Sequence, residues 1–305
     1  MATVPAPRPQ GRLARQETRT FYAFIAPWAI GFLAFTAGPI LASLYFSFTD
    51  YNVTTPPLFV GLSNYSTLFR HDPIFFTALG NTIYYVAFSV PVDIIVAFAL
   101  ALLLNQRVRF LPLFRTLFYV PSIVPLVASV ILWIWLLQPQ WGLIDAVLRL
   151  VGIPGPLWLA DPAWAKPALV LMSAWSVGGM MIIFLAGLQG IPEHLFEAAA
   201  IDGAGRWSKF RHVTIPMMTP TIFFTMIVSI IAQFQVFVQP FIMTNGGPVD
   251  STLMYALYLY QQAWNYLKMG MASAMAWILL VIVLTLTVLQ FRLANRWVYY
   301  EGAER

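Results

Sequence analysis

Residues 197–216 read EAAAIDGAGRWSKFRHVTIP, a polar stretch that lies between two strongly apolar segments. Glycines at 203 and 205 can adopt backbone angles that other residues avoid, so we expect a sharp bend there. Before the bend, residues 192–201 carry apolar side chains at helical spacing, which predicts a short amphipathic helix with Pro192 as its first residue. After the bend, residues 207–212 predict a second short helix along the membrane surface, and Pro216 fits the start of the next long helix.

The composition of the whole chain places this stretch in a membrane protein. Hydrophobic residues make up 60% of its 305 residues and charged residues only 10%. A spanning helix needs about 20 predominantly apolar residues. Six segments meet this requirement: 21–48, 74–104, 116–137, 167–188, 216–244 and 269–290. Because a helix satisfies its own backbone hydrogen bonds in lipid, the sequence predicts an all-α membrane protein with six transmembrane helices.

The basic residues predict the orientation. Thirteen of the 17 Lys and Arg residues lie in the two terminal segments and in the loops after the second and fourth apolar segments. By the positive-inside rule, these parts and both termini are cytoplasmic. The predicted layout is a cytoplasmic tail at 1–20, a six-helix domain at 21–295 and a second tail at 296–305. The first apolar segment is too long for a signal peptide, which favours a retained helix.

The order of residues in 197–216 resembles the EAA loop of binding-protein-dependent ABC importer permeases. The agreement lies in Glu197-Ala198-Ala199, in Asp202-Gly203-Ala204-Gly205 and in Ile215-Pro216, with apolar segments on both sides. The resemblance implies a type I ABC importer permease fold, in which residues 189–216 form a cytoplasmic loop that docks into a separate ATPase subunit. It assigns this coupling to Glu197, Ala198, Ala199, Asp202, Gly203 and Gly205. From the residues alone, the alternative is a loop helix that packs on the membrane face.

From about residue 20 to residue 295 the chain is similar to the sugar-type permeases of this class, of the maltose and glycerol-phosphate type. The similarity is carried by Asn81-Thr82, by Tyr119-Val120-Pro121 and by Gly246-Gly247-Pro248. It implies a complex in a bacterial-type plasma (inner) membrane. The implied partners are a second, related permease, two ATP-binding subunits and an extracytoplasmic binding protein that delivers a sugar-type substrate.

We expect no catalytic residue, cofactor or metal site in this chain. The sequence holds no Gly-x-x-x-x-Gly-Lys-Ser/Thr phosphate loop, so the resemblance places ATP and Mg on the partner ATPase. There is no cysteine, and the three histidines are scattered among the predicted loops. The basic loop faces fit contact with membrane lipid better than binding to nucleic acid.

Polar side chains within the apolar segments are the candidates for substrate binding. Ser229 and Gln233 lie on one face of the fifth predicted helix, and Gln235 flanks them. A glutamine amide in lipid is costly, so it is expected to face protein or a water-filled cavity. The resemblance to the maltose-type pattern places the site near mid-membrane, between the two permeases, and adds Ser122 and Ser173.

Several alternatives remain open at this point. Trp175 and Phe234 either stack on a sugar or pack between helices. Glutamine at 233 departs from the asparagine of the maltose-type pattern, which puts maltose in doubt but leaves a sugar or polyol. A glycerol-phosphate substrate is a second reading, although the apolar segments contain no Lys or Arg to hold a phosphate.

Asp93 is the one ionisable residue deep in an apolar segment. A carboxylate there is expected to be paired, protonated or exposed to water. It predicts either a structural or cavity role or, in an ion-coupled secondary transporter, a proton-coupling role. A secondary transporter would be expected to carry several such carboxylates or two repeated halves with interrupted helices, and neither is visible in the sequence.

Overall fold

A computed structural model describes residues 11–106 and 109–299 of the chain. In these ranges four helices are long and apolar enough to cross a membrane, and two further pairs of helices pass the same test as bent spans. The prediction of six membrane-spanning segments in an α-helical protein is therefore confirmed. The calls on the tail residues 1–10 and 300–305 and on Arg107 lie outside the described residues.

The first span consists of α1 (Arg12–Phe32), a π-helical turn η1 (Leu33–Ala37) and α2 (Gly38–Ser47). The second is α4 (Pro73–Leu104), whose start is capped by Asp72, and the sixth is α15 (Met269–Ala294). Proline at position 73 occupies the first helical residue, where its missing N–H leaves no bond unmade. These three spans agree with the predicted segments to within a few residues at most ends.

The third and fourth spans are broken, which the sequence analysis did not predict. The third comprises α5 (Leu111–Ile123) and α6 (Leu126–Leu136), which meet at 100°, and the fourth comprises α8 (Pro162–Trp175) and α9 (Gly178–Gln189), which meet at 49°. Pro125 explains the first break, because the residue before a proline is driven to an extended backbone and Val124 has ψ 132°. At the second break, a side chain at Gly178 would come within 2.6 Å of the Phe118 carbonyl oxygen, so only glycine lets α5 approach this closely.

The fifth span follows two short helical elements. α10 (Glu193–Ile201) is separated by a loop from α11 (Arg206–Lys209), which continues through the π-helical turn η2 (Phe210–Thr214) into α12 (Ile215–Phe234). α13 (Val238–Met243) completes this 38-residue span, which begins at Arg206. Proline at 216 lies at the start of α12, as predicted, although the π-helical turn before it makes the helical run continuous from Arg206.

The loops at the opposite end of the molecule carry short elements. These are the antiparallel pair β1 (Thr49–Asp50) and β2 (Leu58–Phe59), with Thr49 opposite Phe59, and the helices α3 (Ser63–Arg70), α7 (Leu143–Leu150), α14 (Tyr255–Tyr260) and η3 (Gln261–Asn265). α7 lies between the third and fourth spans, and α14 and η3 lie between the fifth and sixth spans.

A side-chain contact ties this outer layer to the membrane-spanning helices. Asp72, which caps α4, accepts a hydrogen bond from the hydroxyl of Tyr258 on α14. Burial, followed by the hydrogen bond to this carboxylate, raises the pKa of Tyr258 above its usual value. The hydroxyl, which is protonated at neutral pH in any case, therefore remains a donor to Asp72 at more alkaline pH as well.

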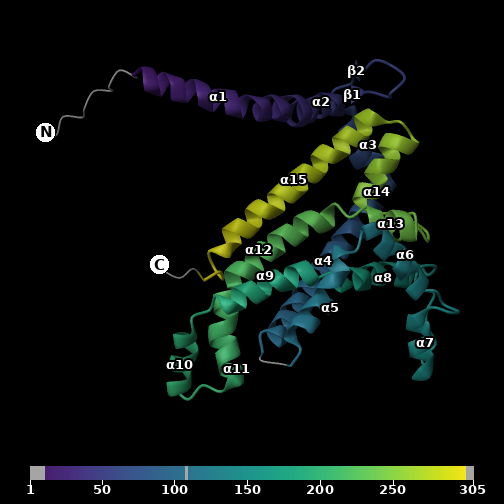
Figure 1. The fold of residues 1–305 in the computed structure, drawn as a ribbon. Coiled ribbons are helices and arrows are strands. Elements are labelled where there is room, and N and C mark those ends of the chain that lie inside the picture. The colour runs from purple at the N-terminus through teal and green to yellow at the C-terminus, as the bar shows by residue number, and fades with distance from the viewer. Residues whose placement is uncertain (1–10, 107–108, 300–305) are drawn as a thin grey trace.

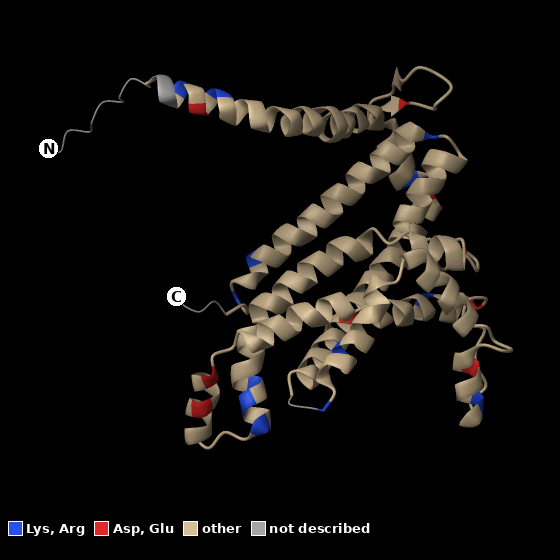
Figure 2. Cartoon of the chain, viewed as in Figure 1, with Lys and Arg blue, Asp and Glu red and all other residues tan. Residues whose placement is uncertain are grey.

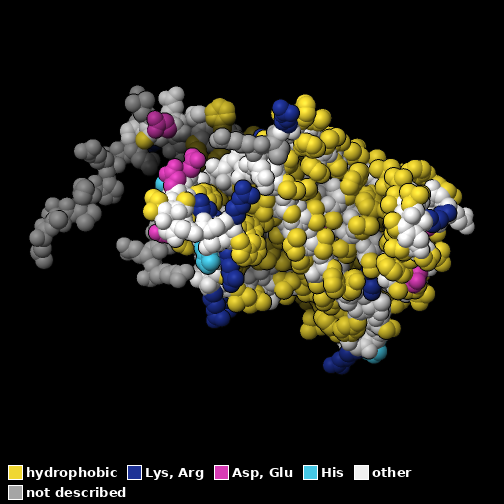
Figure 3. Space-filling view, turned by 90° about the horizontal axis from the view of Figure 1, so that it is seen from below, with side chains coloured by type: hydrophobic (Ala, Val, Ile, Leu, Met, Phe, Trp, Pro, Cys, Tyr) yellow, Lys and Arg dark blue, Asp and Glu magenta, His cyan; other side chains and the backbone are white. Residues whose placement is uncertain are grey.

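Helix α4 is the centre of the bundle and packs against α8, α9 and α12 (Figure 1). In contrast, α1 extends away from the bundle, and this first span is joined to the rest mainly through α2 and α15. The charged residues gather near the ends of the spans and on α10 and α11 (Figure 2). Figure 3 shows a largely hydrophobic face, as expected for helices that contact lipid or a partner.

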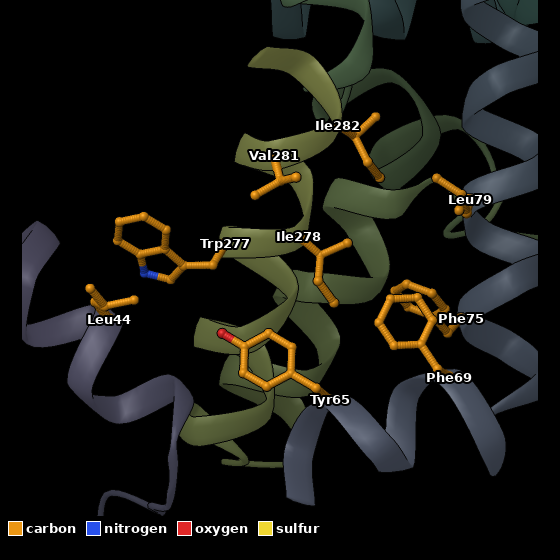
Figure 4. Close-up of a pocket in the computed structure, with 9 residues that line it drawn as sticks. All are labelled: Leu44, Tyr65, Phe69, Phe75, Leu79, Trp277, Ile278, Val281 and Ile282. Carbon is orange, nitrogen blue, oxygen red and sulfur yellow. The ribbon is translucent and has the colours of Figure 1, made fainter. Parts of the chain in front are cut away.

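An apolar cavity lies between α2, α3, α4 and α15 (Figure 4). Its volume is about 380 Å³, and its lining consists of aliphatic and aromatic side chains such as Phe75, Trp277 and Ile282. The hydroxyl of Tyr65, which also lines it, is engaged with the Ser47 hydroxyl at 2.8 Å. This cavity therefore offers little for a polar ligand to bind.

Candidate polar cavity and coupling element

A second cavity, of about 290 Å³, carries the polar side chains of the spans. It is formed by α4, α5, α8, α9, α12 and α13, and it includes both sides of the break between α8 and α9. Its polar lining residues are Asp93, Ser122, Ser173, Ser176, Ser229, Gln233 and Gln239. Four of the five residues predicted for substrate binding thus meet in one place, although they come from three separate spans.

Gln235 does not line this cavity. It follows the last residue of α12, and its amide nitrogen donates to the Ile231 carbonyl oxygen at 3.2 Å. Gln239 on α13 lines the cavity instead. The helix is interrupted between Phe234 and Val238, so the face on which Ser229 and Gln233 lie cannot be extended by counting residues.

Asp93 forms a hydrogen-bonded junction between spans at the cavity. One carboxylate oxygen accepts a hydrogen bond from the Ser173 hydroxyl at 2.8 Å, and the other accepts one from the Gln233 amide at 2.9 Å. The Asp93 side chain is buried. Three spans, α4, α8 and α12, are therefore connected at one carboxyl group within the bundle.

This junction fixes what the neighbouring side chains can offer to a ligand. The Gln233 amide nitrogen donates one of its two protons to Asp93, so the side chain keeps one N–H donor and its carbonyl oxygen as an acceptor. The one hydroxyl proton of Ser173 points to Asp93 and to the Val170 carbonyl oxygen, and its oxygen keeps lone pairs to accept. Ser122 donates to the Tyr119 carbonyl oxygen at 2.7 Å and is likewise left with acceptor capacity. The cavity is thus suited to a ligand that donates several hydrogen bonds.

The two aromatic candidates pack between helices. Phe234 is buried in a cluster with Val86 and Val90 of α4. Trp175 contacts Trp133 edge to face, with ring centroids 6.0 Å apart. Neither is among the residues that line the polar cavity.

The coupling residues of the sequence analysis lie on a projecting helical hairpin. Glu197, Ala198 and Ala199 belong to α10, whose N-cap is Pro192, so this proline precedes the helix and is not its first residue as predicted. Side by side, α10 and α11 extend from the ends of α9 and α12 (Figure 1). Glu197 and Ala198 are exposed, as are the apolar tips Ile201 and Trp207. Exposed apolar groups with a charged rim are typical of a surface that enters a groove on another protein.

The bend after α10 has the backbone geometry that the glycines predict. Gly203 has φ +79°, a left-handed conformation that favours glycine. The amide of Ala204 donates to the Ala199 carbonyl oxygen at 2.8 Å and that of Gly203 to Ala200 at 3.1 Å, which is the Schellman pattern of a helix end. Asp202 is the C-cap residue, and Gly205 is the N-cap of α11 with an extended backbone.

The prediction of a separate second surface helix at 207–212 is wrong. Residues 206–209 form α11, which runs through η2 into α12 as one helical run instead of ending before Pro216. A proline within a helix has no N–H to donate to the fourth preceding carbonyl. The π-helical turn at Phe210–Thr214 changes the hydrogen-bond register just before this proline, and π-turns are a recognised way to accommodate such local disruption. The hairpin is therefore continuous with the fifth span on one side.

Comparison with known proteins gives the family. Residues 93–299, which include the cavity residues and the whole hairpin, match the model of the binding-protein-dependent transport system inner membrane component family. The chain belongs to this family. It is thus a multi-pass inner-membrane permease component of a binding-protein-dependent importer, as the resemblance of the EAA loop implied.

Individual members of the family agree over nearly the full chain. The probable ABC transporter permease protein YesP of Bacillus subtilis (strain 168) is 42% identical over 97% of this chain and 96% of its own length. The lactose transport system permease protein LacF of Rhizobium radiobacter is 36% identical over 90% of this chain and 93% of its own. The two proteins are permeases by name.

The fold also matches a solved permease. A chain in the crystal structure of a bacterial alginate ABC transporter, in complex with an alginate pentasaccharide-bound periplasmic protein, superposes with a TM-score of 0.81. The match covers 94% of this chain and 98% of that chain at 24% identity. The type I ABC importer permease fold expected from the sequence is thereby confirmed.

Proposed function

We propose that this chain forms, together with a second permease, the membrane pathway for a sugar or related polyol that an extracytoplasmic binding protein delivers. The observation that carries the proposal is the junction of Asp93 with Ser173 and Gln233 in the polar cavity. It leaves several acceptor oxygens around a space between otherwise apolar spans. A polyhydroxylated ligand supplies the matching donors, and the name of the lactose-system relative supports the same substrate class.

The charge of the cavity favours a neutral substrate over a glycerol phosphate. Among the described residues that line the cavity, Asp93 is acidic and none is Lys or Arg. A phosphate group beside a carboxyl group would experience repulsion wherever the latter is ionised. A glycerol-phosphate substrate would therefore need its cation from the second permease.

We further propose that ATP is hydrolysed on two partner subunits and that the hairpin of α10 and α11 transmits the resulting movement. Its exposed apolar tips and its continuity with the fifth span support this role, because a force on α11 is carried directly into α12. Both termini and this hairpin are then on the cytoplasmic side. In this arrangement the chain itself needs no catalytic residue and no bound cofactor.

The substrate site is tested with Gln233→Leu. We expect this substitution to raise the concentration of sugar-loaded binding protein needed for half-maximal uptake by roughly three- to ten-fold, because one polar contact, worth about 1 kcal/mol, is lost. Uptake of labelled sugar is measured with the purified complex in vesicles. Gln235→Leu is the matched control, since this amide lies outside the cavity and should leave uptake unchanged. Equal behaviour of the two variants would exclude the cavity as the substrate site.

A further inference from the structure

Helix α4 carries a buried polar stripe that extends beyond the cavity. Asn81, Tyr85, Ser89 and Asp93 follow one another at intervals of four residues, so their side chains lie along one side of the helix. All four are buried. At a rise of 1.5 Å per residue the stripe is about 18 Å long. It runs from the polar cavity towards the end of the bundle at which α14 and the β1–β2 pair lie (Figure 1).

Both ends of this stripe are hydrogen-bonded. Asp93 is bound by Ser173 and Gln233, as described above. At the far end, the Asn81 carbonyl oxygen accepts from the Lys166 ammonium at 3.1 Å, and its amide donates to the Asp250 and Leu253 carbonyl oxygens. The Lys166 ammonium also lies 5.0 Å from the centre of the Tyr84 ring. The side chains of Asn81 and Asp93 are thus both satisfied by hydrogen bonds that hold helices together.

The middle of the stripe is different. The hydroxyls of Tyr85 and Ser89 are buried and make no hydrogen bond of good geometry among the described residues, although the Tyr85 hydroxyl lies close to Ser173 and Asp93. The indole nitrogen of Trp133 on α6, which packs in the same cluster as Tyr85, is also without one. Buried polar groups are nearly always satisfied, and a serine or threonine in a helix has a carbonyl of its own turn within reach. Thr82 and Thr225 in this chain use that solution, whereas Ser89 does not.

We propose that Tyr85, Ser89 and Trp133 form a second segment of the sugar pathway, which is closed in this conformation and leads outward from the cavity. The inference rests on the proposed function. Hydroxyl and indole groups bind sugar hydroxyls, and the rings of Trp133 and Trp175, which meet edge to face, provide the flat apolar surface that a sugar ring also requires. When the segment opens, the unpaired groups gain partners from the substrate or from water.

The broken spans supply the places at which this segment opens. Trp133 and Trp175 lie on α6 and α8, the outer halves of the two bent spans. The breaks at Val124–Pro125 and at Ser176–Val177 separate these halves from α5 and α9. The proposal requires each outer half to move away from α4 at its break. The apolar cavity of Figure 4 has no comparable polar groups and is not part of the pathway.

The experiment compares Tyr85→Phe and Ser89→Ala with the wild type in the complete reconstituted complex. Thermal unfolding and sugar uptake at saturating sugar-loaded binding protein are measured together. Because the deleted hydroxyls have no partner in this conformation, we expect the Tm to stay the same or to rise. We expect uptake to fall about five-fold in each variant, the equivalent of one lost hydrogen bond.

Two matched variants serve as controls. Tyr255→Phe deletes a buried hydroxyl that donates to the Met275 carbonyl oxygen at 2.8 Å, so it should lower the Tm. Thr225→Val deletes a buried hydroxyl that is bonded within its own helix, so it should leave uptake unchanged. Tyr85→Phe is thus expected to behave in the opposite way to Tyr255→Phe in stability and to Thr225→Val in transport.

The inference is overturned if Tyr85→Phe lowers the Tm, because its hydroxyl would then have a structural partner. It is also overturned if Tyr85→Phe and Ser89→Ala take up sugar at the wild-type rate. Gln233→Leu in the same assay distinguishes the two proposals: slow uptake in Gln233→Leu alone leaves the proposed function standing and rejects the outer segment. A wild-type complex that takes up no sugar from its binding protein would reject both.

Discussion

At the scale of single residues, Asp93 decides the character of the cavity. Its carboxyl group holds Ser173 and Gln233 by hydrogen bonds to neutral partners, which suits a role in organising the site more than a role in moving protons. An amide in its place can still accept from Ser173 and reorganise toward Gln233. A leucine cannot, and would leave both partners unpaired in the bundle.

We therefore expect Asp93→Asn to retain most sugar uptake, and Asp93→Leu to lower the yield of assembled complex. Each unpaired buried group costs about 1–3 kcal/mol. Complex yield by size-exclusion chromatography and uptake in vesicles are the measurements. An assembled Asp93→Asn complex that takes up no sugar, combined with dependence of wild-type uptake on a pH gradient, would instead establish proton coupling.

At the scale of an element, the bend between α10 and α11 depends on one backbone conformation. Gly203 is left-handed, whereas Gly205 has φ −70° and is extended. We expect Gly203→Ala to disturb the hairpin by roughly 1–2 kcal/mol, which is the steric cost of that conformation for a residue with a side chain. Gly205→Ala should be tolerated, because its backbone suits any residue and nothing lies within 4 Å of an added methyl group.

The readout is sugar-stimulated ATP hydrolysis by the assembled complex, which should decrease in Gly203→Ala, decrease further in Gly203→Pro, and be unchanged in Gly205→Ala. Equal activity of the two alanine variants would mean that the bend has no part in coupling.

The charge of α10 gives an independent test of its docking role. Glu197 is exposed on the helix, and no apolar span changes when it is replaced. We expect Glu197→Lys to abolish uptake and coupled ATP hydrolysis, because the rim of the docking surface is reversed in charge. The variant should still insert into the membrane, which protease protection of the loops can establish. Normal uptake in this variant would reject the coupling assignment.

At the scale of the whole molecule, the exposed apolar surface indicates that the chain works in an assembly. None of the most hydropathic part of the first span is buried, and α1 stands apart from the bundle (Figure 1). Lipid alone could cover such a helix in the membrane. The exposed apolar side chains of the projecting hairpin lie outside the six apolar segments, so we expect a partner protein to cover them. We expect purification in mild detergent to yield a second permease and an ATPase with this chain. Recovery of an active transporter that contains this chain alone would contradict the proposed assembly.

The sequence by itself determined the features that depend on neighbouring residues. Six long apolar segments predict spanning helices because lipid offers no hydrogen bonds to the backbone. The glycine at 203 predicts the bend because its conformation is a local property. The spacing of Glu197, Gly203 and Pro216 indicates the family, and the four-residue spacing of Ser229 and Gln233 places them on one face of the fifth span.

Only the tertiary structure decided which polar groups meet. Asp93 and Gln233 are 140 residues apart, and no local pattern reports that their side chains touch. Gln239 lines the cavity and Gln235 does not, because the helix is interrupted between Phe234 and Val238. Helical periodicity cannot predict such an interruption. In the sequence, Tyr85 and Ser89 are ordinary members of an apolar helix, and only the packing of α6 and α8 against α4 shows that their hydroxyls are buried without a well-formed hydrogen bond in the part of the chain that the structure describes.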